Sequence, residues 1–190
     1  GGAYYQLLFN QCSMLMQSIV NCPKPVIAEI DGIATAAGCQ LVASCDLAIA
    51  SNESKFATPG VNIGLFCSTP MVALSRNVSN KNAMKMLLTG EMITAKEATN
   101  IGLINSNVKK DIVKKEVLDL ASSIASKSMI TVSTGKKAFY VQSEMNLSDA
   151  YLYTSGVMKD NLLRSDAKEG ISAFLEKRNP NWDESEDLDL

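Results

Sequence analysis

The stretch from Lys24 to Gly64 constrains the fold of this chain more than any other part of the sequence. It reads KPVIAEIDGIATAAGCQLVASCDLAIASNESKFATPGVNIG. Val26–Ile30 is rich in β-branched residues and ends at the turn signal Asp31-Gly32, and Ala36–Cys45 has the composition of a compact, small-residue helix. The stretch therefore predicts a strand that feeds a short turn and then a helix, with two more short strands behind it.

The start of that helix is a candidate binding site. The first backbone N–H groups of a helix have no partner within it, and they favour an oxygen atom that carries partial or full negative charge. Ala36, Ala37 and Gly38 have no bulky side chain that would keep a ligand away from this backbone. The same small residues would also let the helix pack closely on a sheet, so the residues alone leave both interpretations open.

Helices dominate the rest of the predicted structure. Ala3–Asn21 has apolar residues at helical spacing and is stopped by two prolines, whereas Leu47–Ala50, Lys55–Thr58 and Leu103–Val108 are predicted strands. Thr94 and Glu97 form a capping box for a short helix that stops at Gly102, and Gly90 ends the helix before it. Further helices are predicted at Pro70–Asn77, Asn80–Leu88, Asp111–Ser126, Ile130–Glu144, Ser148–Asn161 and Ser165–Lys177, the last two capped by Ser148-Asp149 and Ser165-Asp166.

This order of elements predicts an α/β core followed by a helical region. We divide the chain into the core at 1–110, a C-terminal helical region at 111–182 and an acidic tail at 183–190. The helices of the second region have no sheet of their own to cover. We therefore expect them to form an oligomerisation surface or a lid.

Composition excludes several classes of site. Histidine is absent, so the chain has no Ser-His-Asp triad, Cys-His pair or HExxH zinc site, and we expect no metal. A net charge of −2 argues against nucleic acid as a partner, and no apolar run reaches the roughly 18–20 residues of a membrane span. The five cysteines lack CxxC spacing and are interpreted as reduced, buried thiols of an intracellular protein: Cys12, Cys22, Cys39, Cys45 and Cys67.

Four segments, in order, resemble the enoyl-CoA hydratase/isomerase (crotonase) family from Tyr4 to Trp182: KPVIAEIDGIATAAGCQLVASCDLAIAS, KFATPGVNIGL, LLTGEMITAKEATNIGLIN and DAKEGISAFLEKRNPNW. The resemblance implies a ClpP/crotonase-like α/β spiral of ββα turns with a helical trimerisation region, and a homotrimer or a dimer of trimers. It also implies binding of acyl-CoA thioesters in fatty acid metabolism, with coenzyme A as part of the substrate and no tightly bound cofactor.

The beginning of the chain departs from that family pattern. Gly1-Gly2-Ala3 enters helical sequence without a preceding strand. We therefore expect the chain to lack the first strands of the family, the turn that carries the first of two oxyanion-hole donors, and any targeting sequence. Family analogy predicts a mitochondrial protein, with a cytoplasmic location as the alternative.

The resemblance also assigns residues of the site. The second oxyanion-hole N–H corresponds to Ala37, flanked by Ala36 and Gly38, and the positions of two catalytic glutamates hold Gln40 and Gly60. A glutamine can hydrogen-bond but cannot exchange a proton at neutral pH, and glycine offers only its backbone. General acid–base catalysis is worth roughly 10²–10⁴-fold per group, so we expect hydration to be severely depressed.

The resemblance also bears on the remaining carboxylates near this stretch and on further contacts with the ligand. Between Ile33 and Arg76 the only carboxylates are Asp46, which matches a structural position of the family, and Glu53, which lies in a polar turn and is expected to be solvated. Besides the helix start, the resemblance implies that Cys67 and Ser68 contact the substrate at the mouth of the acyl pocket. Phe174 and Lys177 are three residues apart, so we expect them on one face of the last helix, where the resemblance implies contact with the nucleotide.

Three functions remain open from the sequence. The first is an acyl-CoA-binding family member, leaning towards an enzyme of the hydratase/isomerase (lyase) type, that stabilises an enolate-like thioester. The second is a catalytically silent acyl-CoA-binding or assembly module, which the pair Gln40 and Gly60 favours. The weakest is a thioester hydrolase that uses Cys67 or Ser68, because no histidine exists to act as their base.

Overall fold

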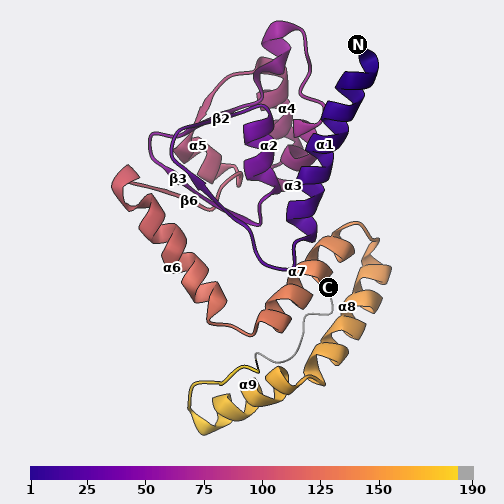
Figure 1. Ribbon diagram of the computed structural model, residues 1–190, viewed down its shortest axis with the longest axis vertical. Helices are drawn as coiled ribbons and strands as arrows, with labels where there is room; N and C mark the ends of the chain where they lie inside the picture. Colours follow the sequence, from indigo (N-terminus) through magenta and orange to yellow (C-terminus); the bar gives the residue numbers. More distant parts are fainter. Residues whose placement is uncertain (184–190) are drawn as a thin grey trace. The chain divides into compact units, whose positions relative to one another are not determined.

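The computed structural model describes residues 1–183, and the chain forms two compact units (Figure 1). The first contains Gly1–Cys22 and Val26–Leu120, and the second contains Pro23–Pro25 and the residues from Ala121 onward. Of the predicted acidic tail, only Asp183 lies among the described residues. No helix within residues 1–183 is long and apolar enough to cross a membrane.

Strands of the first unit form two small sheets within the described residues. One is entirely parallel, with β3 (Leu47–Ser51) between β1 (Ile27–Ile30) and β6 (Ser106–Val108). In the other, β4 (Lys55–Ala57) pairs in parallel with β2 (Ile33–Thr35) and antiparallel with β5 (Ile93–Thr94). A strand of the first sheet, a strand of the second sheet and a helix follow one another twice, as β1, β2 and α2 and then as β3, β4 and the helices from η1 onward. This order confirms the predicted α/β spiral of ββα turns.

The helices follow most of the predicted boundaries, because local signals define their ends. The Thr94–Glu97 capping box is present, and Gly90 and Gly102 adopt the left-handed conformation that ends or follows a helix. The helices of the first unit are α1 (Gly2–Asn21), α2 (Ala37–Ser44), the 3₁₀ helix η1 (Pro59–Ile63), α3 (Pro70–Asn77), α4 (Asn80–Thr89), α5 (Ala95–Asn100) and η2 (Lys110–Ile112).

The remaining helices are α6 (Val113–Ala125), which passes from the first unit into the second, α7 (Met129–Ser143), α8 (Leu147–Leu162) and α9 (Ser165–Glu176). Two predicted caps are wrong. The α8 cap is Asn146, whose side chain accepts a hydrogen bond from the Asp149 N–H, and α9 begins after Arg164 without a side-chain cap, so Ser165 is its first residue. In both cases the residue with extended backbone that precedes the helix, Asn146 or Arg164, comes before the Ser-Asp pair that was predicted to be the cap.

Two strands were not predicted, and one predicted strand needs correction. β2 and β5 were not predicted, because at three and two residues they are too short to show a periodic pattern. The strand predicted at Leu103–Val108 covers only Ser106–Val108, while Leu103 and Ile104 pack as loop residues into the core. Pairing with other strands, which a single segment does not encode, fixes these short elements.

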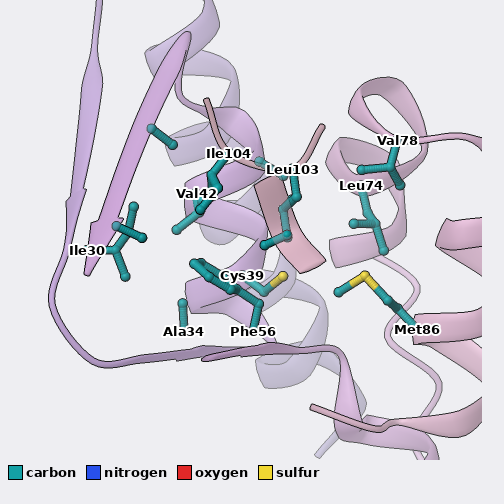
Figure 2. Close-up of a cluster of buried hydrophobic side chains, with 14 of the residues drawn as sticks. Ile30, Ala34, Cys39, Val42, Phe56, Leu74, Val78, Met86, Leu103 and Ile104 are labelled. Carbon is teal, nitrogen blue, oxygen red and sulfur yellow. The ribbon is translucent and has the colours of Figure 1, made fainter. Parts of the chain in front are cut away.

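The core of the first unit lies around α2 (Figure 2). Phe56 on β4 is completely buried, and Cys39 on α2 and Leu74 on α3 are nearly so. The α2 residues in this core are Cys39, Val42 and Ala43. Of the residues at the helix start, Ala36 and Gly38 are half-buried and Ala37 is exposed. This core holds the start of α2 in a fixed position.

Residues after α9 fold back onto it within the second unit. The Arg178 guanidinium pairs with both carboxylate oxygens of Glu169, and the Asn181 N–H donates to the same carboxylate. The Trp182 indole N–H donates to the Ser126 carbonyl at 2.9 Å and lies against Gly170. These contacts lower the pKa of Glu169 to about 2, chiefly through the hydrogen bond from Arg178.

We predict that replacing Phe56 by alanine lowers the free energy of unfolding by about 3–5 kcal/mol, because the substitution opens a cavity around a fully buried ring. Phe139→Ala is the matched control: this ring is 63% exposed and its loss should cost less than about 1 kcal/mol. Urea unfolding measures both. Equal losses for the two variants would contradict this description of the core.

We predict that the Glu169–Arg178 contact stabilises the second unit only above strongly acidic pH. The folded-state pKa of Glu169 lies below its ordinary value of 4.5, so its contribution is complete above that value and disappears as the pH falls towards 2. The stability difference between the natural protein and Glu169→Gln should therefore shrink over this range. Trp182, the single tryptophan of the chain, reports unfolding by fluorescence; a pH-independent difference would refute the assignment.

Candidate functional site

The parallel pair β2–β4 brings the two halves of the candidate site together. Thr35, the last residue of β2, lies opposite Ala57, the last residue of β4. Because the carboxyl ends of parallel strands meet at one edge of a sheet, the start of α2 and the start of η1 lie at the same edge. Ala37 and Gly60, which are far apart in the sequence, are therefore placed near the ends of neighbouring strands.

Ala36 connects the strand to the helix in a strained conformation. Its φ of 48° and ψ of −115° lie outside the regions that residues with a side chain normally adopt. Its N–H donates to the Ala57 carbonyl at 3.0 Å, and its carbonyl accepts from the Gln40 N–H at 3.0 Å. These two bonds hold the strained residue in place, and such strain is concentrated at functional sites.

The peptide N–H of Ala37 is the open donor at this helix start. Its orientation is set by the ψ angle of Ala36, and among residues 1–183 it has no hydrogen-bond acceptor. Ala37 is exposed, and Gly38 has no side chain that could cover the backbone. The Ala37 N–H is therefore a donor without an acceptor in residues 1–183, on an exposed residue.

Gln40 lies one turn further along α2 and is 4% exposed. The Cys12 thiol on α1 donates to its side-chain Oε1 at 3.7 Å, while its Nε2 has no acceptor among the described residues. Among residues 1–183, Thr58 Oγ1 is the only fully buried side-chain nitrogen or oxygen atom without a hydrogen-bond partner. Because Gln40 Nε2 has no partner and does not belong to this class, it retains some access to solvent. Sequence reasoning did not identify Cys12, because nothing in α1 signals a partner on α2.

Gly60 has no room for a side chain. A Cβ atom at this position would lie 2.1 Å from the Leu65 carbonyl oxygen and 2.8 Å from the Cys67 sulfur. Both distances are far below van der Waals contact, and the first involves backbone. The chain after η1 therefore fills the space that a carboxylate side chain at residue 60 would need.

Cys67 and Ser68 do not have the surroundings of a nucleophile. Cys67 is buried and its sulfur accepts a hydrogen bond from the Gly60 N–H at 3.3 Å. Ser68 is exposed, and its hydroxyl donates to the Phe66 carbonyl at 3.4 Å. Burial, with a smaller effect of nearby Cys67, raises the pKa of the Cys39 thiol to about 12, so that thiol stays protonated.

The two nearby carboxylates have structural or surface positions. The Asp46 carboxylate accepts from the Val26 N–H at 2.7 Å, which joins the turn after α2 to the start of β1. Glu53 is exposed and lines a surface depression together with Asp31, Asn52 and Lys109–Asp111. Within residues 1–183, no group of three or more histidine, cysteine, aspartate and glutamate residues is arranged to hold a metal ion.

Phe174 and Lys177 belong to the second unit. Phe174 is 81% exposed on α9, but Lys177 follows the end of that helix with a φ of 56°, in the left-handed conformation. The prediction that the helix continues through Lys177 is therefore wrong, and helical spacing does not place the two residues on one face. Lysine at this position replaces the usual glycine of a helix end.

Comparison with known proteins identifies related sequences. A sequence model described as "Enoyl-CoA hydratase/isomerase" matches residues 2–185. The human and rat proteins called "Enoyl-CoA hydratase domain-containing protein 3, mitochondrial" are 53% and 52% identical over 182 residues, which is 96% of this chain and 60% and 61% of theirs. The segment Phe66–Pro70 resembles this same group of proteins. The chain thus spans about three fifths of the length of these relatives.

Solved structures have the same fold. The crystal structure of the human enoyl-CoA hydratase domain-containing protein 3 gives a TM-score of 0.93 at 53% identity and covers 96% of this chain and 72% of its own. An enoyl-CoA hydratase of Mycobacterium smegmatis gives 0.94 at 48% identity, with 96% and 71% covered. More distant is the (E)-benzylidenesuccinyl-CoA hydratase of Thauera aromatica, 37% identical over 161 residues, or 83% of this chain and 62% of its own.

We predict that Gly60→Ala destabilises the protein by at least about 1–3 kcal/mol, because its Cβ would overlap the Leu65 carbonyl oxygen. Gly38→Ala is the control within the same site: its Cβ would meet only Ala34 at 4.0 Å, and alanine is the better helix former. Urea unfolding of both variants tests this. A neutral Gly60→Ala would show that residues 65–67 move aside easily.

Proposed function

The chain belongs to the enoyl-CoA hydratase/isomerase family, and on that premise we propose that it binds acyl-CoA thioesters. The observation that supports the proposal most directly is the Ala37 N–H, which is exposed, unpaired among the described residues and aimed by the strained Ala36. A thioester carbonyl is an acceptor suited to such a donor, and its partial charge grows when an enolate-like form develops. A donor that is fixed in advance stabilises this charge.

The residues around the Ala37 N–H are uncharged, and this limits the reactions that we propose for a bound thioester. Gln40 cannot exchange a proton, and residue 60 offers only a backbone N–H, which donates to the Cys67 sulfur. We propose that an enzymatic role, if the protein has one, uses enolate stabilisation and not the two-glutamate hydration. The second candidate, a silent acyl-CoA-binding or assembly module, is favoured by the same pair of residues.

The remaining parts of the proposal rest on the family. Relatives named mitochondrial make a mitochondrial location the first choice, with the cytoplasm as the alternative. We propose a homotrimer or a dimer of trimers that takes part in fatty acid metabolism, with coenzyme A bound as part of the substrate. Phe174 and Lys177 are proposed to contact the nucleotide, since an exposed ring and a cationic side chain suit adenine and phosphate.

We predict that the intact protein hydrates a short enoyl-CoA at least about 10²–10⁴-fold more slowly than an ordinary hydratase, because both proton-transferring groups are missing. Loss of the ultraviolet absorbance of the conjugated thioester measures the rate. Gln40→Glu alone should not restore hydration, since Gly60 has no room for the second carboxylate. Turnover close to that of ordinary hydratases would refute this part of the proposal.

We predict that replacing the Ala37 peptide by an ester weakens acyl-CoA binding about 2- to 10-fold, because the ester lacks the N–H donor and keeps the side chain. Incorporation of the α-hydroxy analogue of alanine at residue 37 makes this change, and calorimetry measures the affinity. The same replacement at Ser126, outside the proposed site, is the control. If the Ala37 ester binds as tightly as the natural protein, this N–H is not the thioester donor.

A further inference from the structure

The helix α9 ends at a residue that is unusual for its position. Lys177 has a φ of 56° and a ψ of 40°, the left-handed conformation that glycine normally supplies at a helix end. The Lys177 N–H donates to the Phe174 carbonyl at 3.3 Å. The next N–H, that of Arg178, donates to the Ala173 carbonyl at 3.0 Å, so backbone bonds close the helix. A residue with a side chain adopts this conformation at a cost, and such outliers are concentrated at functional positions.

The side chain that follows, Arg178, binds two carboxylates of α9 at once. Its Nη1 and Nη2 donate to the two oxygens of Glu169 at 2.5 and 2.9 Å, and its Nε donates to Glu176 Oε2 at 2.6 Å. Glu169 Oε1 also accepts from the Asn181 N–H. Glu176 Oε1 accepts from the Ser172 hydroxyl at 2.8 Å. Every oxygen of the two carboxylates therefore has a donor, and the pKa of both groups is lowered, chiefly through the hydrogen bonds from Arg178.

Lys177 is left as an exposed cation without an anionic partner. It lies between Glu176 and Arg178 in the sequence, and among residues 1–183 its ammonium group has no hydrogen bond or ion pair. The planar fork of an arginine matches the geometry of a carboxylate, whereas a lysine is only a point charge on a flexible stem. Arg178 therefore outcompetes Lys177 for the carboxylate of Glu176, and the Lys177 ammonium group stays accessible.

We propose that Arg178 is a positioning residue that keeps the Lys177 ammonium group available to the phosphates of coenzyme A. This inference rests on the proposed function, in which Lys177 contacts the nucleotide. Without Arg178, the carboxylate of the neighbouring Glu176 is free to pair with Lys177, and a negative charge beside the ammonium group repels a phosphate. The Nε, Nη1 and Nη2 of Arg178 already donate to carboxylates of α9, so Arg178 acts through Lys177.

Calorimetric titration of the intact protein with butyryl-CoA and with S-butyrylpantetheine, which has the thioester but no phosphate, tests the inference. At low ionic strength Arg178→Gln should bind butyryl-CoA about 2- to 5-fold more weakly than the natural protein and the pantetheine ester equally well. Adding Glu169→Gln and Glu176→Gln to Arg178→Gln should restore the affinity for butyryl-CoA, because neither carboxylate is then left to pair with Lys177. A purely structural role of Arg178 does not give this recovery. Lys168→Gln, the matched control, removes a positive charge elsewhere on α9 and should bind both ligands like the natural protein.

The outcomes separate this inference from the proposed function. If the natural protein binds neither ligand, both are wrong. Lys177→Gly suits the left-handed conformation and should fold well, yet it should bind butyryl-CoA as weakly as Arg178→Gln. Full affinity of Lys177→Gly overturns the nucleotide contact and this inference with it, and leaves thioester binding intact. Full affinity of Arg178→Gln, or no recovery in the triple variant, overturns the role of Arg178 alone.

Loss of the contacts of Arg178 also affects the fold around α9, so thermal unfolding followed by the fluorescence of Trp182 checks each variant. If a variant with Arg178→Gln does not fold, Arg178→Lys provides the test. A lysine holds one of the two carboxylates but not both, so this variant should bind butyryl-CoA with an affinity between those of the natural protein and Lys177→Gly. An affinity equal to that of the natural protein overturns the inference.

Discussion

The short parallel pairing of β2 with β4 is the interaction on which the site depends. Three residues of each strand pair, and the bond from the Ala36 N–H to the Ala57 carbonyl extends the pairing just beyond the strand end. That bond holds Ala36 in a conformation that alanine avoids, and the conformation orients the next peptide N–H, which has no acceptor among residues 1–183. The core around α2 supplies the stability that offsets this local strain.

The site that results consists of neutral donors. It contains a peptide N–H at Ala37 and a carboxamide at Gln40, which accepts from the Cys12 thiol. The Cys67 sulfur accepts from the Gly60 N–H, and burial raises the pKa of the Cys39 thiol to about 12. Fixed dipoles of this kind stabilise charge that develops on a bound oxygen, but they do not deliver or remove protons. This arrangement fits the proposed binding of a thioester carbonyl group.

Local signals made much of the fold predictable. The start of α2, the capping box at Thr94 and the glycine stops lie within a few residues of the elements they define, and the family resemblance identified the ββα order. β2, β5 and the Asn146 cap were missed because pairing partners or backbone geometry determine them. The Cys12–Gln40 contact and the crowding at Gly60 were not predicted either, because they arise between segments that meet only in the folded chain.

The crowding at Gly60 also limits which sequences this backbone accepts. Because the Leu65 carbonyl oxygen lies where a Cβ atom of residue 60 would be placed, an acidic residue does not fit there unless residues 65–67 move. An attempt to engineer a carboxylate at this position therefore has to redesign the following loop together with residue 60.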